Sequence, residues 1–274
     1  MIDAYLDESG IHDGAVICTI AGYLGGRGQF RKLATAWCEH LANFEVPMEK
    51  FHAKDLIPKP QGFFFGWERE RYDLFIDGLI KVITKYKLHP VSASVVVSDF
   101  YSLSEMQRRF FTGATLDDGK LIGSGSPNKP YWIAFHDCIQ TVACYAPVGG
   151  KAHYFFGLNR PFAEYAEVLF RDIKDNWTTT LCRERLGAIG FPLAKETAPL
   201  QAADFLVHLD YHHAIKHHAA GTLGASQPDG LLLKCLERSR SSRDDHSFYN
   251  RAGFQKALDH TYESYPNWDM QSSS

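Results

Sequence analysis

The chain has 274 residues, 45% of them hydrophobic and 14% aromatic, which is enough for one large α/β domain or two small ones with a packed core. Its 29 basic and 32 acidic residues give a formal net charge of −3, which excludes a molecule-wide cationic field that would attract DNA nonspecifically. No apolar run approaches the length of a membrane span and no signal segment precedes the first expected strand, so we expect a soluble, cytoplasmic protein without a membrane partner.

The hydrophobic periodicity predicts an N-terminal antiparallel hairpin followed by alternating helices and strands. The first strand starts at Ile2 and ends on Asp7 and Glu8. Further strands are expected at 15–23, 90–98, 152–156 and 186–191. Helices are expected at 30–41, 67–85, 131–145, 161–177, 199–218, 231–237 and 253–262.

Two segments do not follow this alternation. Residues 48–56 precede Pro58 and Pro60 and are expected to form a third strand followed by a loop. Residues 98–130 mix polar, aromatic and glycine positions and are expected to be an irregular insertion bordering a site. With no internal repeat or clear boundary, we predict a single α/β domain over residues 1–274, with a mixed sheet of five or six strands, flanking helices and extra C-terminal helices.

The six cysteines are expected to be buried free thiols rather than metal ligands or nucleophiles. They are scattered without a CxxC pair, and most lie in apolar-periodic stretches. They are Cys18, Cys38, Cys138, Cys144, Cys182 and Cys235.

Two adjacent carboxylates, Asp7 and Glu8, end the first strand. In strand geometry they point to opposite faces, so only one of them faces a given cleft unless the strand has already broken. Asp7 shares a face with Asp3 and Tyr5 and is the better candidate for a metal ligand or general base. The alternative is that Asp7 closes the hairpin by accepting backbone N–H groups in an Asx-turn.

A second acidic constellation lies near residue 200. Pro199 suits a first helical turn, which places Asp204 in the second turn, near the positive end of the helix dipole. The small residues Ala202 and Ala203 would let this helix approach a sheet closely and bring Asp204 toward the strand-end acids. Dipole stabilisation of the helix is the alternative role for Asp204.

Histidines offer further candidates at two places. His208 follows Asp204 by one helical turn, so a shared metal or an Asp–His pair is open. For His212 to His218 we expect a solvated polar face. His52 contributes to a site only if its segment lies next to the first strand.

No P-loop, HExxH or GxSxG pattern occurs, and the 25–28 glycine run lacks the dinucleotide spacing. The remaining candidates are carboxylates, whose hard oxygens suit Mg²⁺ or Mn²⁺. Pairs of these ions activate water and stabilise the leaving oxygen during phosphodiester cleavage.

Two segments together resemble the domain-of-unknown-function family 3800. They are Tyr5-Leu6-Asp7-Glu8-Ser9-Gly10 and Pro199-Leu200-Gln201-Ala202-Ala203-Asp204-Phe205, and the resemblance spans roughly residues 1–215. Phe51-His52-Ala53 is similar to the family's histidine-containing segment. The resemblance implies a ribonuclease H-like fold and a metal-dependent nuclease activity, which for the family is itself an inference.

By this resemblance Asp7 is the first-strand ligand and Asp204 the late-helix ligand, with Glu8 nearby. Many relatives close the strand at 154–156 with an Asp, whereas Gly157-Leu158-Asn159 follows here. Asn159 offers a carbonyl oxygen as ligand but no charge, so Glu196, Asp137 or His52 would have to replace the missing carboxylate. The site is therefore either rearranged or decayed.

The leading hypothesis is a nuclease that cleaves RNA or DNA with Mg²⁺ or Mn²⁺. Asp7, Glu8 and Asp204 are its expected catalytic acids, with Asp7, Asp204 and Asn159 as metal ligands and His52 or Glu196 assisting proton transfer. The expected substrate-binding residues are Ser9, Lys195 and Gln201. The alternatives are a catalytically decayed binding module in a larger system, such as a defence system, and a hydrolase of a small phosphorylated metabolite.

Overall fold

The computed structural model describes residues 1–56, 60, 62–117, 120–122, 126, 128–176, 180–222, 228, 230–236 and 246–264. Its centre is a mixed sheet with the strand order β7-β6-β1-β2-β3-β8. The strands are β1 (Ile2–Ser9), β2 (Ile17–Gly25), β3 (His89–Val96), β6 (Ala152–Phe156), β7 (Leu186–Gly190) and β8 (His246–Tyr249). The fold is therefore α/β, as predicted.

The N-terminal hairpin lies in the middle of this sheet. β1 pairs antiparallel with β2 and β2 antiparallel with β3, whereas β6 runs parallel to β1 and β7 parallel to β6. All nine residues of β2 are buried, as expected for a central strand covered on both faces. β8 pairs parallel with β3 at the edge and was not predicted.

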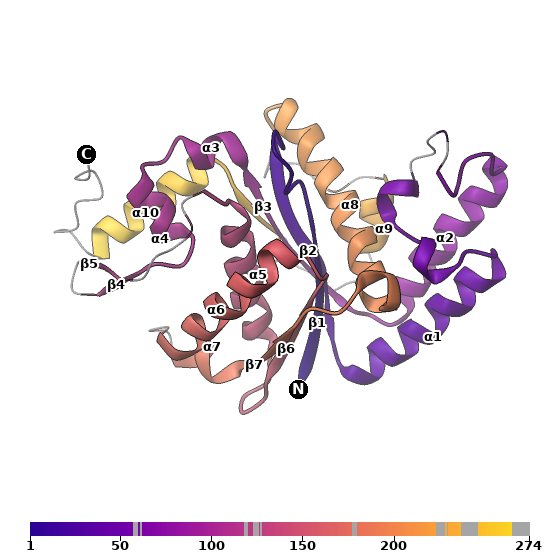
Figure 1. Ribbon diagram of the computed structural model, residues 1–274, viewed down its shortest axis with the longest axis horizontal. Coiled ribbons are helices and arrows are strands. Elements are labelled where there is room, and N and C mark those ends of the chain that lie inside the picture. Colours follow the sequence, from indigo (N-terminus) through magenta and orange to yellow (C-terminus); the bar gives the residue numbers. More distant parts are fainter. Residues whose placement is uncertain are drawn as a thin grey trace.

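Helices cover both faces of the sheet (Figure 1). On one face lie α1 (Arg27–Asn43), α2 (Arg69–Lys85), α8 (Ala198–Ala219) and α9 (Gly230–Leu236). On the other face lie α5 (Tyr131–Tyr145) and α6 (Arg160–Asn176), followed outward by α7 (Thr180–Arg185), α3 (Val97–Tyr101), α4 (Glu105–Phe111) and α10 (Arg251–Ser264). Each face has its own hydrophobic cluster, with Leu6 on the α5 side and Tyr23 on the α8 side.

α8 is the helix that positions the candidate site. Residues 198–207 are all buried, because they lie between the sheet and the surrounding helices rather than at the surface. Pro199 stands in its first turn, as predicted. The small side chains of Ala202 and Ala203 let α8 pack closely against β1 and β2.

The third strand predicted at residues 48–56 is wrong. This segment forms two short 3₁₀ helices, η1 (Met48–Lys50) and η2 (Ala53–Leu56). Its backbone bonds close locally, as in Lys50 N–H to the Pro47 carbonyl at 2.9 Å, so no strand ladder forms. Phe51 anchors it by packing edge-on against Trp37 of α1.

The 98–130 segment is less irregular than predicted. It contains the helices α3 and α4 and a separate antiparallel pair, β4 (Thr115–Asp117) with β5 (Lys120–Ile122). Ser104 caps α4 by accepting the Gln107 N–H, a local signal for helix that was present in the sequence. Most glycines of this insertion lie outside the described residues.

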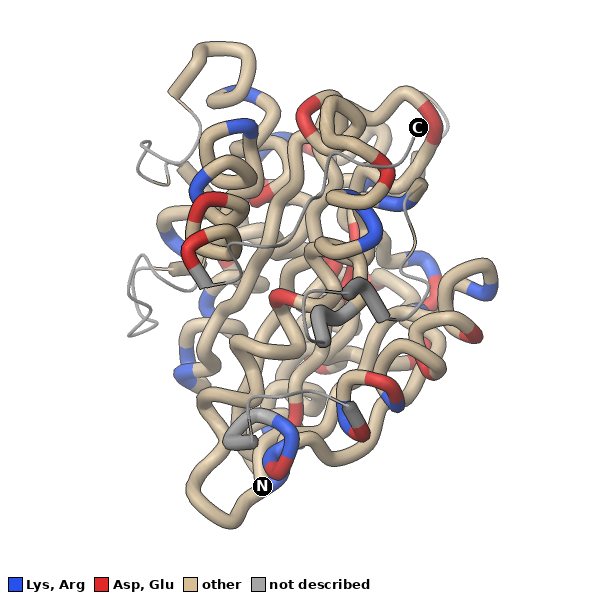
Figure 2. Tube along the Cα trace, turned by 90° about the vertical axis from the view of Figure 1, so that its left-hand side faces the viewer, with Lys and Arg blue, Asp and Glu red and all other residues tan. Residues whose placement is uncertain are grey.

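Cysteine burial follows the prediction for Cys18, Cys138 and Cys235, but Cys38 and Cys144 are exposed, which corrects the expectation. Within the described residues none of those five forms a disulfide, and the side chain of Cys182 lies outside them. In the described part of the chain, no helix has both the length and the apolar character needed to cross a membrane. Figure 2 shows Lys and Arg interspersed with Asp and Glu along the described trace.

Candidate functional site

Asp7 and Glu8 both lie inside β1, because the strand continues to Ser9. Asp7 pairs with Ala21 of β2, and the hairpin turn begins only after Ser9. Asp7 therefore does not close the turn, and the Asx-turn alternative is wrong. Its Oδ1 instead accepts the N–H of Glu8 at 3.0 Å, within the strand. The two carboxylates leave the backbone on opposite faces of the sheet, as strand geometry requires.

Asp204 lies in the second turn of α8 and is only 9% exposed. Its Oδ2 accepts a hydrogen bond from the Ala53 N–H at 2.8 Å and lies 3.0 Å from His52 Nδ1 in an ion-pair contact. The tertiary structure thus brings His52 to an acid 152 positions later in the chain. Within the described residues, no hydrogen bond engages the other oxygen, Oδ1.

The three carboxylates influence one another. Burial raises the pKa of Asp7 well above its usual value, and the charges of Glu8 and Asp204 raise it further. Burial also raises the pKa of Glu8 to about 7. The charge of Asp204 raises this pKa further, whereas the hydrogen bond from Asn159 lowers it. Among the described residues, no lysine or arginine forms an ion pair with any of the three. Among the described residues, His52 is therefore the one basic side chain that contacts these acids.

Glu8 is oriented by the loop after β6. Asn159 Nδ2 donates a hydrogen bond to Glu8 Oε1 at 3.0 Å, whereas the buried Oε2 has no hydrogen-bond partner in the described structure. An orphaned carboxylate oxygen is costly unless a cation or a proton satisfies it. Asn159, predicted as a metal ligand, thus contacts the site through Glu8.

The donor set fits a hard divalent cation in kind. It consists of carboxylate oxygens of Asp7, Glu8 and Asp204, and one of them is buried without a partner. Among the described residues, however, no group of three or more His, Cys, Asp or Glu side chains lies close enough together to hold a metal. The fit is therefore one of donor chemistry and not of a preformed geometry.

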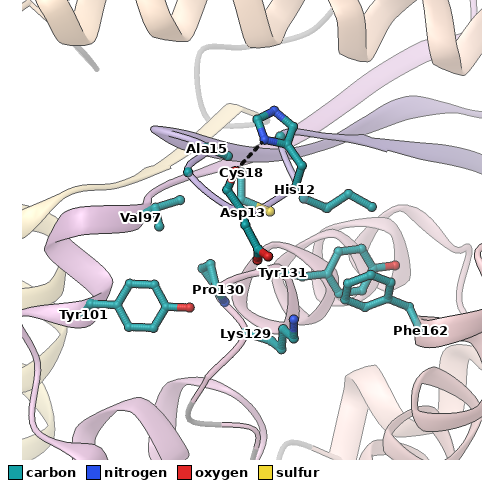
Figure 3. Close-up of a pocket in the computed structure, with 13 residues that line it drawn as sticks. His12, Asp13, Ala15, Cys18, Val97, Tyr101, Lys129, Pro130, Tyr131 and Phe162 are labelled. Atoms are coloured by element: carbon teal, nitrogen blue, oxygen red, sulfur yellow. Dashed lines mark hydrogen bonds between the residues drawn. The ribbon is translucent and has the colours of Figure 1, made fainter.

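A pocket of about 210 Å³ adjoins the Glu8 side of the site. Cys18 and Tyr131 line it, and the charge of Glu8 contributes to raising the pKa of both. Figure 3 shows Asp13, Lys129 and Tyr101 pointing toward the middle of this pocket. The Lys129 ammonium also lies 5.9 Å from the centre of the Phe162 ring. The pocket thus combines a cation with aromatic walls.

The predicted substrate-binding residues are placed in different surroundings. Ser9 is the half-buried last residue of β1, next to Glu8. Gln201 is 1% exposed. Its side-chain Oε1 accepts a hydrogen bond from Trp37 Nε1 at 2.9 Å, and its Nε2 donates one to the Met48 carbonyl at 2.7 Å. Both polar ends of Gln201 are therefore used to hold α1 and η1 against α8.

The exposed Lys195 and Glu196 lie on η3 (Ala194–Glu196), before α8. Glu196 lines a different pocket, together with Asp3 and Arg27 at the start of β1 and α1. No described hydrogen bond or ion pair joins Lys195 or Glu196 to Asp7, Glu8 or Asp204. The structure thus gives neither residue a contact with the three acids.

The remaining candidates also find other partners. Asp137 on α5 accepts a hydrogen bond from Tyr249 of β8 at 2.6 Å. The ring of His208 packs against His212 at 4.5 Å. His213, expected on a solvated face, is buried, because that turn of α8 still lies against the sheet.

Lys129, Tyr131 and the hydrogen bond between Asn159 and Glu8 were missed by sequence reasoning. Lys129 precedes the predicted helix at 131–145, and a cation before a helix N-terminus is a local signal for an anion site.

A scan against protein-family models and a search of curated proteins each found no match to this chain.

Proposed function

We propose that this protein is a divalent-metal-dependent phosphodiesterase of the ribonuclease H-like type, acting on RNA or DNA. The observation that supports it is that α8 carries Asp204 against β1, where the charge of Asp204 contributes to raising the pKa of Asp7. Buried carboxylates that raise one another's pKa are unfavourable unless they serve a charge-binding task.

The topology is consistent with this proposal. The hairpin β1–β2 lies at the centre of a mixed sheet, and α8 carries Asp204 against β1. This is the arrangement of a first-strand acid and a late-helix acid that the resemblance to family 3800 predicts. The cytoplasmic location stays a prediction.

Asp7 and Asp204 would hold Mg²⁺ or Mn²⁺ through their carboxylate oxygens, while Glu8 leaves β1 on the other face of the strand. When bound, such an ion activates water and stabilises the leaving oxygen of a phosphodiester. His52 is positioned for proton transfer: because the Asp204 carboxylate only accepts, His52 Nδ1 carries the proton and Nε2 presents its lone pair. The His52 side chain is 49% exposed, so Nε2 is accessible to a substrate.

The pocket beside Glu8 supplies the local cation that a nucleic acid requires. Lys129 and the N-terminus of α5 favour a phosphate there, and Tyr101 and Phe162 offer rings on which a base can stack. Asp13 opposes Lys129 in the same pocket and limits the net attraction (Figure 3). This balance of charge favours contacts with one or two phosphates over binding along an extended stretch of nucleic-acid backbone.

The test is calorimetric titration with Mn²⁺, combined with cleavage assays on single- and double-stranded RNA and DNA. Wild-type protein should bind Mn²⁺ and cleave one of these substrates, and Asp7→Asn and Asp204→Asn should lose both. Asp73→Asn, on the exposed face of α2, is the control that should keep both. Cleavage that survives in Asp7→Asn would refute the proposal.

One observation favours the non-catalytic alternative. Residue 157, at the end of the strand beside Asp7, is a glycine and supplies no carboxylate. A protein that binds Mn²⁺ through Asp7 and Asp204 yet cleaves neither nucleic acids nor small phosphoesters would be a decayed binding module. Cleavage of small phosphoesters alone would indicate the metabolite hydrolase.

A further inference from the structure

A second pocket, of about 510 Å³, lies at the opposite end of β1 from the three acids. Asp3 and Tyr5 line it from β1, Phe155 from β6, and Arg27 and Arg31 from the first turns of α1. Asp3 precedes Asp7 by four strand residues, which separates the two sites by about 13 Å. Its volume falls in the range of small-molecule sites.

The most informative residue of this pocket is Asp3, which is 2% exposed. Its Oδ2 lies 3.5 Å from Arg27 Nε, a long ion pair with a side chain that is 67% exposed. Its Oδ1 is buried and has no hydrogen-bond partner in the described structure. A buried carboxylate oxygen without a donor is costly, so a ligand that offers N–H groups here would gain binding energy.

The aromatic side chains next to Asp3 form a surface for a planar ring. Tyr5 and Phe155 are stacked, with ring centroids 4.7 Å apart and an interplanar angle of 18°. Phe30 packs against Tyr5 from α1 at 4.5 Å. Because Tyr5 already contacts both of these rings, Phe155, which is partly buried and lines the pocket, is the ring available to a planar ligand. Nucleobases stack on such rings.

The same pocket also offers positive charge. Arg27 and Arg31 are exposed on the first two turns of α1, where the helix dipole also favours an anion. Glu196 also lines the pocket, so the formal charges of Asp3 and Glu196 offset those of the two arginines. This balance favours a ligand with both N–H donors and an anionic group over a simple polyanion.

We propose that this pocket is a binding site for a guanine nucleotide. The guanine edge presents two adjacent donors, N1–H and the 2-amino group, which a carboxylate such as Asp3 accepts. Adenine presents an acceptor beside its amino donor, and this acceptor would face the carboxylate. The base stacks against Phe155, and the phosphate lies toward Arg31. The site is independent of the metal-dependent activity proposed above.

The first test is calorimetric titration with guanosine, inosine and adenosine monophosphates in EDTA. Guanosine monophosphate should bind at least about tenfold more tightly than the other two, because each of them leaves an Asp3 interaction unmade. Asp3→Asn and Arg31→Ala should each weaken it by about tenfold or more. Asp73→Asn is the matched control on α2, and Arg31→Ala keeps the test decisive if Asp3→Asn does not fold.

A second measurement uses the two exposed cysteines. Cys38 lines this pocket, whereas Cys144 lies at the end of α5 on the other side of the sheet. Guanosine monophosphate should slow alkylation of Cys38 by iodoacetamide and leave Cys144 unchanged, as read by mass spectrometry.

Three outcomes would overturn the inference: no binding at millimolar nucleotide, equal binding of the three nucleotides, or unprotected Cys38. Asp7→Asn should leave nucleotide binding unchanged. If it abolished binding, the nucleotide would occupy the metal site, and the inference would fail while the proposed function stood.

Discussion

The carboxylate of Asp7 lies against the backbone of Gly157, so closely that a Cβ at residue 157 would come within 2.7 Å of Asp7 Oδ1. The closeness follows from the parallel pairing of β1 with β6, in which Leu6 is opposite Phe156. Gly157 N–H also donates to the Leu6 carbonyl at 3.2 Å. Residue 157 therefore controls where the Asp7 side chain can lie.

Gly157→Ala should displace the Asp7 carboxylate while the fold persists. The atom in the way is the end of a side chain and φ of Gly157 is not left-handed, so we expect the free energy of unfolding to change by less than about 1 kcal/mol. Affinity for Mn²⁺ should fall by about tenfold, because a ligand is misplaced. Calorimetry and urea unfolding measure the two effects. Gly28→Ala, where a Cβ meets only open space, is the control, and unchanged Mn²⁺ affinity in Gly157→Ala would contradict the prediction.

The metal-free protein should lose stability as pH rises from about 4.5 to 7 through the Glu8 carboxyl. The pKa of Glu8 is about 7 in the folded state, against 4.5 in a free chain, so folding favours the protonated form and this stabilisation disappears above pH 7. The loss is at most about 3 kcal/mol. Urea unfolding in EDTA at pH 5 and pH 8 measures it.

Glu8→Gln should reduce this loss, while Glu263→Gln, at an exposed position on α10, should behave as wild type. An identical decline in Glu8→Gln and wild type would show that Glu8 ionises normally.

His52→Ala should reduce catalysis more than metal binding. Asp204 holds His52 by its Nδ1, and the proposed proton transfer uses Nε2. We expect kcat to fall by about a hundredfold. Affinity for Mn²⁺, measured by calorimetry, should stay within about threefold, because His52 is not a proposed ligand. His260→Ala, on the exposed face of α10, is the control. A loss of Mn²⁺ binding as large as the loss of kcat would instead make His52 a ligand.

Gln201→Ala should destabilise the fold rather than remove a substrate contact. The substitution leaves the buried Trp37 Nε1 without a partner and removes one of the two hydrogen bonds to the Met48 carbonyl, which we expect to cost about 1–3 kcal/mol of unfolding free energy. Urea unfolding checks this, with Gln255→Ala on α10 as an exposed control. Wild-type stability combined with weaker substrate binding would restore the substrate-binding interpretation.

Local pattern was sufficient for most of the sheet and the long helices. The alternation of Ile2 to Asp7 and the buried run of β2 predicted the hairpin, because a strand repeats every two residues. The helical spacing of Phe30, Leu33 and Trp37 predicted α1 for the corresponding reason. Pro199 fixed the start of α8, and hence the turn in which Asp204 lies. The strand predicted at 48–56 was wrong because short 3₁₀ turns have no hydrophobic period comparable to that of a strand or an α-helix.

The sequence by itself thus determined that Asp7 lies in the first strand and that Asp204 lies early in a helix. Only the tertiary structure decided that α8 carries Asp204 against β1, that His52 contacts Asp204, and that Asn159 orients Glu8. The tertiary structure also decided that the Gln201 amide is hydrogen-bonded inside the fold, and that one carboxylate oxygen of Asp3 has no hydrogen-bond partner in the described structure. The physical reason is that such contacts join segments up to 164 positions apart, and their geometry depends on how α8 packs against the sheet, which no local period records.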